Sequence, residues 1–290
     1  MSDKYEIPKQ EKPIKKSDIE DIFGLSPMQE GMLYEMLMQA NSGAYHVQMD
    51  CKLTGPVHVA HFLAAWRLLC QRHTIFPSSF THEGIEKPVQ VVLKAREPEC
   101  QFVDLREDLN ASDANIALGD CDCSSDKSSI IEQYLTVDFA KGFDLERDAL
   151  MRLSLYQVKE NEFRFVWCFP HILIDAWSMG LVIEDLTMLY RQLCDEGVAK
   201  KSLAPVVPWK NYIKWLKAQN PQLAKNYWQN YLSGYEEVVE LPWRNPKPTD
   251  YVIGEMTISL GAELSASLAS MASQRSTTVN NVFQAVWGLV

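Results

Sequence analysis

The sequence predicts an α/β protein of the α+β type, in which mixed sheets pack against helices. Two apolar stretches, residues 150–158 and 163–169, are separated by four polar residues, which is typical of a β-hairpin. Helical patterns occur between such strands, so a mixed sheet is expected instead of a doubly wound parallel one. The chain has 290 residues, of which 47% are hydrophobic and 23% charged, enough for a sizeable core.

Charge and cysteine usage exclude several functional classes. The net charge of -10 argues against a nucleic-acid partner. Seven widely spaced cysteines, an odd number, indicate a reducing compartment, and the pair Cys121 and Cys123 has no second ligand pair with which to form a metal site. We find no signal peptide and no membrane-spanning stretch, so a cytoplasmic protein without a membrane partner is expected.

The N-terminal part begins with a polar, proline-containing stretch, and a flexible arm is expected over residues 1–20. A helix is expected from Pro27, because Ser26 is a good N-cap and Gln29 occupies the capping-box position. The apolar stripe of this helix consists of Met28, Met32, Leu33 and Met36.

Residues 44–55 alternate as a strand does, and residues 58–73 carry a strong apolar helical face. The members of this face are Val59, Phe62, Leu63, Trp66, Leu69 and Cys70. Pro77 prevents the helix from continuing, and residues 89–93 form a short strand. A surface loop is expected over residues 110–129.

The remaining helices are expected at residues 129–140, 177–193, 209–219, 221–232, 262–274 and from 279 onward. The helix over residues 177–193 should bury Trp177, Leu181, Val182, Leu186, Leu189 and Leu193. A strand is expected over residues 251–260. The last helix ends on apolar residues without a stop signal, so we expect the chain to be a fragment of a longer protein.

The chemically competent residues His171 and Asp175 lie between the second hairpin strand and the following helix. An imidazole is partly neutral near pH 7 and can accept a proton from an amine or a hydroxyl group. Asp175 can orient the loop, pair with an arginine or cap the helix. The spacing alone favours a simpler interpretation, in which His171 is a satisfied core histidine and Asp175 only a cap.

Several motifs change that balance. Residues 170–178, PHILIDAWS, resemble the HHxxxDGWS signature of condensation domains in nonribosomal peptide synthetases. Residues 25–33 are similar to the first motif of that family, and residues 72–80, RHTIFPSSF, to its RHxxLRTxF motif. Further matches are found at residues 208–216, 227–234 and 240–242. The resemblance extends from about residue 22 to the end of the chain.

This resemblance implies a fold like that of chloramphenicol acetyltransferase, with two lobes around a tunnel. Residues 21–180 would form the complete N-terminal lobe and residues 181–290 the start of the C-terminal lobe. The implied reaction is amide-bond formation between a donor thioester and an acceptor amine, each on a carrier protein. Both substrates would arrive on 4'-phosphopantetheine arms, the domain having no cofactor or metal of its own, and an adenylation domain would be adjacent.

The resemblance makes His171 the catalytic residue, which positions or deprotonates the amine or stabilises the tetrahedral intermediate. Asp175, Arg72, Trp177 and Ser178 would support the site. Pro170, Ala176 and Pro77 replace the first histidine, the glycine and an arginine of the motifs. That arginine is the usual partner of the aspartate, so Arg72 is the candidate substitute.

In this family the second lobe continues well beyond residue 290, so weak or no activity is expected from residues 1–290 alone. Two alternatives remain open. One is an acyltransferase of the same fold that uses a free or coenzyme A-linked donor. The other is a degenerate, non-catalytic module that binds carrier proteins.

Overall fold

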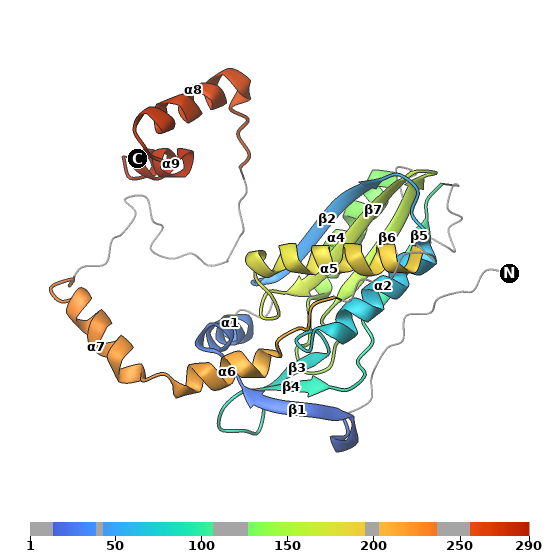
Figure 1. The fold of residues 1–290 in the computed structure, drawn as a ribbon, viewed down its shortest axis with the longest axis horizontal. Coiled ribbons are helices and arrows are strands. Elements are labelled where there is room, and N and C mark those ends of the chain that lie inside the picture. Colours follow the sequence, from blue (N-terminus) through green and yellow to red (C-terminus); the bar gives the residue numbers. More distant parts are fainter. Residues whose placement is uncertain (1–13, 39–42, 107–126, 195–202, 237–255, 290) are drawn as a thin grey trace. The chain divides into compact units, whose positions relative to one another are not determined.

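The computed structural model describes residues 14–38, 43–106, 127–194, 203–236 and 256–289 (Figure 1). The chain divides into two compact units, residues 1–238 and residues 239–290. The elements of the first unit are η1 (Lys16–Asp18), β1 (Ile19–Gly24), α1 (Pro27–Met38), β2 (His46–Thr54), α2 (Val59–Arg72), β3 (Ser78–Thr81), β4 (Val89–Leu93), β5 (Glu99–Asp104), α4 (Lys127–Lys141), β6 (Arg152–Lys159), β7 (Glu162–Pro170), α5 (Ala176–Cys194), α6 (Trp209–Ala218) and α7 (Pro221–Tyr231). The second unit contains α8 (Gly261–Gln274) and α9 (Val279–Trp287).

The larger sheet of the first unit has the strand order β2-β7-β6-β5. Strand β7 is antiparallel to both β2 and β6, whereas β5 and β6 are parallel. The β2–β7 ladder runs from His46 opposite Pro170 to Thr54 opposite Glu162. The predicted hairpin and the mixed sheet are therefore confirmed, while β5 is a strand that the sequence pattern does not predict.

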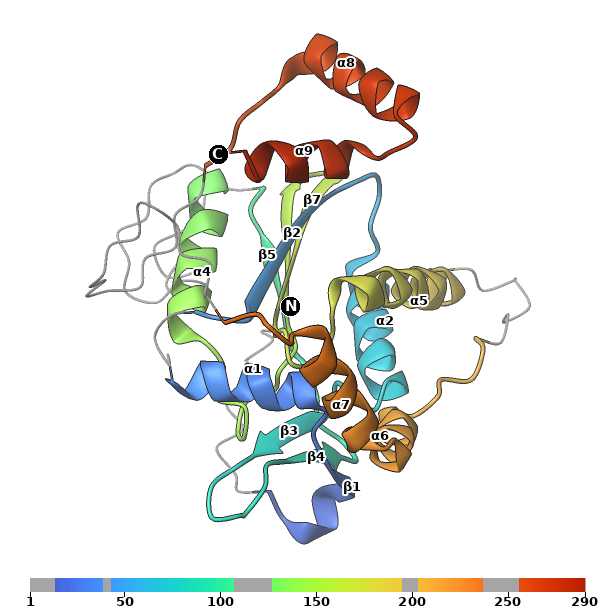
Figure 2. The ribbon, with the colours of Figure 1, turned by 90° about the vertical axis from the view of Figure 1, so that its left-hand side faces the viewer.

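Helices cover both faces of this sheet, with α2 and α5 on one side and α4 on the other (Figure 2). Successive side chains of a strand point to opposite faces of the sheet, so those of β7 divide between two apolar clusters. On one face, Phe163, Phe165, Trp167 and Phe169 join the core that includes α2 and α5. On the other face, Val166 and Cys168 pack in a second cluster with Ile130 and Ile131 of α4. Strand β7 is thus buried on both faces.

A smaller antiparallel sheet has the order β1-β4-β3. Strand β1 starts at Ile19, so the end of the predicted arm at residue 20 falls inside a strand, and residues 1–13 lie outside the described residues. An ion pair of 2.8 Å between Lys210 of α6 and Asp21 ties α6 to this sheet. The strand predicted at residues 89–93 is confirmed as β4, and β3 was not predicted.

Two apolar stripes were assigned too broadly from the sequence. Met28 of α1 is 71% exposed and Trp177 of α5 is 90% exposed. Met28 lies five residues before the buried Leu33, and Trp177 five residues before the buried Val182. Five residues correspond to a rotation of about 140° around the helix axis, so each exposed side chain points away from the buried face. Leu181, about 100° from Val182, is also exposed.

The predicted lobe boundary between residues 180 and 181 lies inside α5, and the division into lobes stays a prediction. Of the strand predicted over residues 251–260, residues 256–260 are not a strand, and residues 251–255 lie outside the described residues. Of the loop predicted over residues 110–129, the last three residues belong to α4 and the rest lies outside the described residues. The other predicted helices are found within one or two residues.

Among the described helices, none is long and apolar enough to cross a bilayer.

The two tryptophans Trp167 and Trp177 give a direct test of this core. Trp167 is fully buried, and its ring meets that of Trp66 edge-on at 5.3 Å. We expect Trp167→Ala to lower the free energy of unfolding by about 3–5 kcal/mol, because it leaves a large cavity. Trp177→Ala should change it by less than about 0.5 kcal/mol. Urea denaturation measures both, and equal losses would contradict the assignment of the core.

Candidate active site

His171 is the first residue after β7 and lies in a turn. Its backbone N–H donates to the carbonyl oxygen of Tyr45 at 2.7 Å, and Leu173 N–H donates to Pro170 O at 3.1 Å. Proline has no backbone N–H, so it is tolerated at the end of a strand, where the ladder requires no donor. Pro170 therefore closes the strand and passes the chain directly into the turn that holds His171.

The three residues after His171 anchor the turn. Ile172, Leu173 and Ile174 are all buried in the core shared with α2 and α5. The imidazole of His171 is half-buried. Its Nδ1 is buried and has no hydrogen-bond partner in the described part of the chain.

Asp175 caps α5, as the sequence predicts. Its Oδ1 accepts hydrogen bonds from the backbone N–H and the hydroxyl of Ser178, each at 2.8 Å. The backbone N–H of Ser178, then its hydroxyl and the nearby charge of His171, lower the pKa of Asp175 below its ordinary value. The exposed carboxylate is thus ionised at neutral pH.

Arg72 does not act as the substitute partner of Asp175. Its Nε donates to Asp185 of α5 at 2.8 Å, and the same carboxylate contacts Nε2 of His73 at 2.8 Å. Arg72 also donates to the carbonyl oxygen of Ala204. Burial lowers the pKa of His73, and the hydrogen bond and charge of Asp185 offset part of this shift. Arg72 therefore fastens α2 to the middle of α5, and the direct support of Asp175 comes from Ser178.

A buried chain of hydrogen bonds joins the three motif regions. The side chains of Ser26 and Gln29 form the predicted capping box, with bonds of 3.0 and 3.3 Å. The amide nitrogen of Gln29 also donates to the Ile172 carbonyl at 3.3 Å and to Gln90 at 3.4 Å. Gln90 in turn donates to Ser78 at 2.9 Å. Gln29 thus links α1 and β4 to the residue that follows His171.

Sequence reasoning missed the roles of Gln90 and Ser78. Both side chains are completely buried. The available signal was Gln90 itself, a lone polar residue within the apolar strand of residues 89–93. A buried amide needs partners, so its presence there indicates a buried polar connection.

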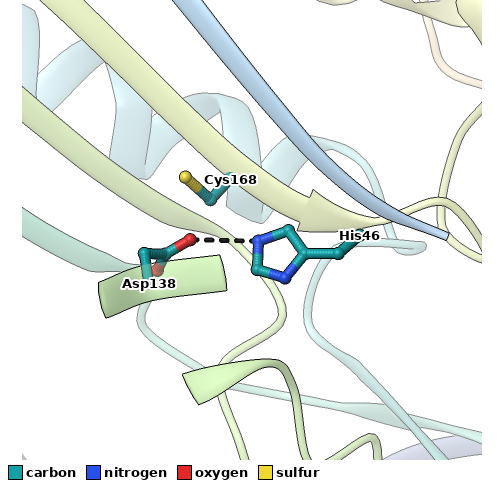
Figure 3. Close-up of side chains that lie close together, drawn as sticks. All are labelled: His46, Asp138 and Cys168. Atoms are coloured by element: carbon teal, nitrogen blue, oxygen red, sulfur yellow. Dashed lines mark hydrogen bonds and ion pairs between the residues drawn. The ribbon is translucent and has the colours of Figure 1, made fainter. Parts of the chain in front are cut away.

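Beneath the other face of the sheet lies a second polar cluster, formed by His46, Asp138 and Cys168 (Figure 3). The Nε2 of His46 contacts Asp138 at 3.0 Å, and Arg152 pairs with the other carboxylate oxygen at 2.8 Å. Gln48 donates to Asp138 at 3.0 Å. Burial raises the pKa of Asp138, but the His46 hydrogen bond and the charge of Arg152 outweigh it, and the pKa lies below its ordinary value.

The three potential ligand atoms of this cluster lie within 4.8 Å of one another. However, Arg152 and Gln48 direct N–H donors at Asp138, and burial raises the pKa of the Cys168 thiol well above its usual range. A metal ion needs deprotonated ligands with free lone pairs. The arrangement fits a hydrogen-bonded ion pair better than a metal centre.

Comparison with known proteins shows the family of the chain. The family model described as Condensation domain matches residues 19–290. Over 95% of its length, the chain is 34% identical to tyrocidine synthase 2 of Brevibacillus parabrevis and 32% identical to surfactin synthase subunit 3 of Bacillus subtilis strain 168. It covers only 7% and 20% of those two proteins.

Solved structures show the same fold. The starter condensation domain of rhizomide synthetase matches with a TM-score of 0.61 and 16% identity, over 75% of this chain and 49% of that one. The first condensation domain of the calcium-dependent antibiotic synthetase, in complex with a substrate analogue, matches with a TM-score of 0.58 and 19% identity, over 75% and 49%. The chain therefore spans about half of each matched domain.

Gln29 gives a test of the buried connection. Gln29→Ala leaves the Ile172 carbonyl and the Gln90 amide oxygen without this donor, and we expect a loss of about 1–3 kcal/mol in the free energy of unfolding. The matched control is Glu30→Ala, which alters the neighbouring exposed residue of α1. Equal unfolding midpoints for the two variants would show that the connection does not stabilise the fold.

The cap gives a pH-dependent test. Asp175→Ala should cost about 0.5–2 kcal/mol at pH 7, whereas Asp175→Asn, which keeps the acceptor, should cost a few tenths. Because the pKa of Asp175 is lowered in the folded state, its stabilisation is complete above the unfolded pKa of about 3.9 and is lost as the pH falls. The Asp-to-Ala difference should therefore shrink in unfolding experiments below about pH 4, and a constant difference would contradict this.

Proposed function

Because this chain belongs to the condensation domain family of nonribosomal peptide synthetases, we propose that it is part of an enzyme that joins two carrier-bound substrates through an amide bond. The family resemblance and the mixed α/β fold expected from the sequence are confirmed. The proposal concerns the whole protein, since the matched synthetases are much longer than this chain.

The observation that carries the proposal is the setting of His171. Its backbone is held between Tyr45 and the buried residues 172–174, and Nδ1 faces the interior. With Nδ1 buried, Nε2 is the ring nitrogen that we propose meets the substrate, four residues before the ionised Asp175. A rigidly placed imidazole at the end of a strand suits a group that must meet an incoming amine.

In the proposed step, the amine nitrogen of the acceptor attacks the thioester carbonyl of the donor. His171 Nε2 accepts the amine proton as the C–N bond forms, and the C–S bond breaks as the tetrahedral intermediate collapses. The proton passes to the departing thiolate of the donor arm. Proximity of two tethered substrates supplies much of the rate, so one proton carrier is sufficient.

The same proposal includes the partners of the reaction. Donor and acceptor carrier proteins would deliver their substrates on 4'-phosphopantetheine arms, and an adenylation domain would load them. Residues 21–180 and 181–290 would contribute to the first and second lobes. A cytoplasmic location fits the free thiols of the five described cysteines.

The test uses the full-length synthetase with loaded donor and acceptor carriers. His171→Ala should lower the single-turnover rate of amide formation by about 10²–10⁴-fold, as expected for loss of a proton carrier. The control is His61→Ala, a partly exposed histidine of α2. An unchanged rate in His171→Ala would favour the non-catalytic alternative.

A second comparison separates the two enzymatic alternatives. The same protein is given an acyl group either on the donor carrier or on coenzyme A. Product from the carrier alone supports the condensation reaction. Equal or faster reaction from coenzyme A would favour an acyltransferase that uses a free donor.

A further inference from the structure

Tyr45 has an unusual backbone for its residue type. Its φ is 61°, and in the described chain Tyr45 and Ser276 are the two non-glycine residues with positive φ. Bulky L-residues rarely adopt this left-handed conformation, which persists only where the surroundings impose it. Such outliers gather at functional sites, so the contacts of Tyr45 are informative.

Both parts of Tyr45 meet His171. The Tyr45 carbonyl oxygen accepts the backbone N–H of His171 at 2.7 Å. The two rings lie edge to face, with centroids 6.4 Å apart and planes at 79°. The left-handed backbone sets the direction of this carbonyl, because φ and ψ of Tyr45 orient the peptide group that carries it.

The next residue explains what holds Tyr45 in place. The side chains of His46 and Asp138 are only 4% and 2% exposed, and they are joined at 3.0 Å. The His46 ring also stacks on Phe139, with centroids 5.3 Å apart. The His46 backbone N–H donates to Gly43 O at 3.1 Å, which closes the turn around Tyr45.

Gly43 is required for this turn. Its φ is 66°, and a Cβ built at this position would lie 2.0 Å from the Phe139 ring. The turn of residues 43–46 is thus packed directly against the end of α4. Asp138, the partner of His46, is itself fixed by Arg152 at 2.8 Å. The described contacts form a continuous path from α4 through His46 to Tyr45 and on to His171.

We propose that Tyr45 is a positioning residue for His171, and that the buried His46–Asp138 pair locks Tyr45 in the left-handed conformation that aims its carbonyl at the His171 N–H. This proposal rests on the catalytic role proposed for His171. Tyr45 itself does not exchange a proton in it. Its carbonyl and ring keep the imidazole in the orientation in which Nε2 meets the amine.

The sharpest test compares Tyr45→Asn with Tyr45→Val in the full-length synthetase. Both substitutions remove the ring, but asparagine tolerates the left-handed conformation and a β-branched valine does not. Tyr45 is exposed, so both variants should remain folded. Hydrogen exchange of the peptide that contains the His171 amide, followed by mass spectrometry, reports on the bond to Tyr45 directly.

We expect faster exchange of that peptide in Tyr45→Val than in Tyr45→Asn. The single-turnover rate should be about 10–100-fold lower in Tyr45→Val than in Tyr45→Asn, with an unchanged half-saturating concentration of acceptor carrier. Equal exchange in the two variants would overturn the proposal. The proposal would also be overturned if the His171 peptide exchanged faster in Tyr45→Val but the two variants had equal single-turnover rates, provided that His171→Ala abolishes activity.

Asp138→Asn tests the lock. It removes the charge that holds His46 and should increase exchange at His171. The control is Asp50→Asn, which breaks the ion pair with Arg164 on the same β2–β7 ladder, four residue pairs away from His46. Equal effects of the two variants on the His171 peptide would show that only ladder stability matters and would overturn the lock.

The two proposals fail in different ways. If His171→Ala keeps full activity, the proposed function fails, while the exchange measurements still decide whether Tyr45 positions the histidine. If His171→Ala abolishes activity and the Tyr45 variants behave alike in both exchange and rate, the function stands and the positioning role fails.

Discussion

The register of the β2–β7 ladder is the constraint on which the rest of the site depends. With His46 opposite Pro170, the Tyr45 carbonyl meets the His171 N–H, Trp167 and Phe169 enter the core with α2 and α5, and Cys168 faces α4. A slip of one residue would turn every β7 side chain to the opposite face. The large aromatic side chains on one face make such a slip costly, so the same packing that stabilises the sheet also fixes His171.

A second constraint comes from the buried amide of Gln29. It satisfies the Ile172 carbonyl in the turn after His171, at a place where an unpaired carbonyl would be costly. Through Gln90 and Ser78 the same contacts reach the smaller sheet. The turn is therefore held on one side by the Tyr45 carbonyl and on the other by the Gln29 amide. These two contacts explain why the backbone of His171 is anchored although it lies in a turn.

Local patterns were sufficient for part of this structure. The hairpin, the capping box of Ser26 and Gln29 and the cap by Asp175 depend on residues close in sequence, and each could be predicted. The Gln29 amide instead reaches Ile172, 143 residues away, and Arg72 selects Asp185, 113 residues away, and not Asp175. A single sequence carries no signal for such pairings. The positive φ of Tyr45 likewise arises from tertiary contacts and has no local signature.

Of the departures from the family motifs, Pro170 has a structural explanation, and the setting of Asp175 bears on chemistry. Pro170 ends β7 where no further N–H is needed, and the Pro77 carbonyl accepts the N–H of Leu93 at 2.7 Å at the entrance to β3. Pro170 thus belongs to the architecture of the sheet, whereas nothing in the structure explains Pro77 or Ala176. Asp175, with Ser178 as its donor in place of an arginine, keeps a carboxylate charge that no arginine contact of the described chain neutralises. In the reaction proposed above, a carboxylate near His171 would stabilise the positive charge that the imidazole gains on accepting the amine proton.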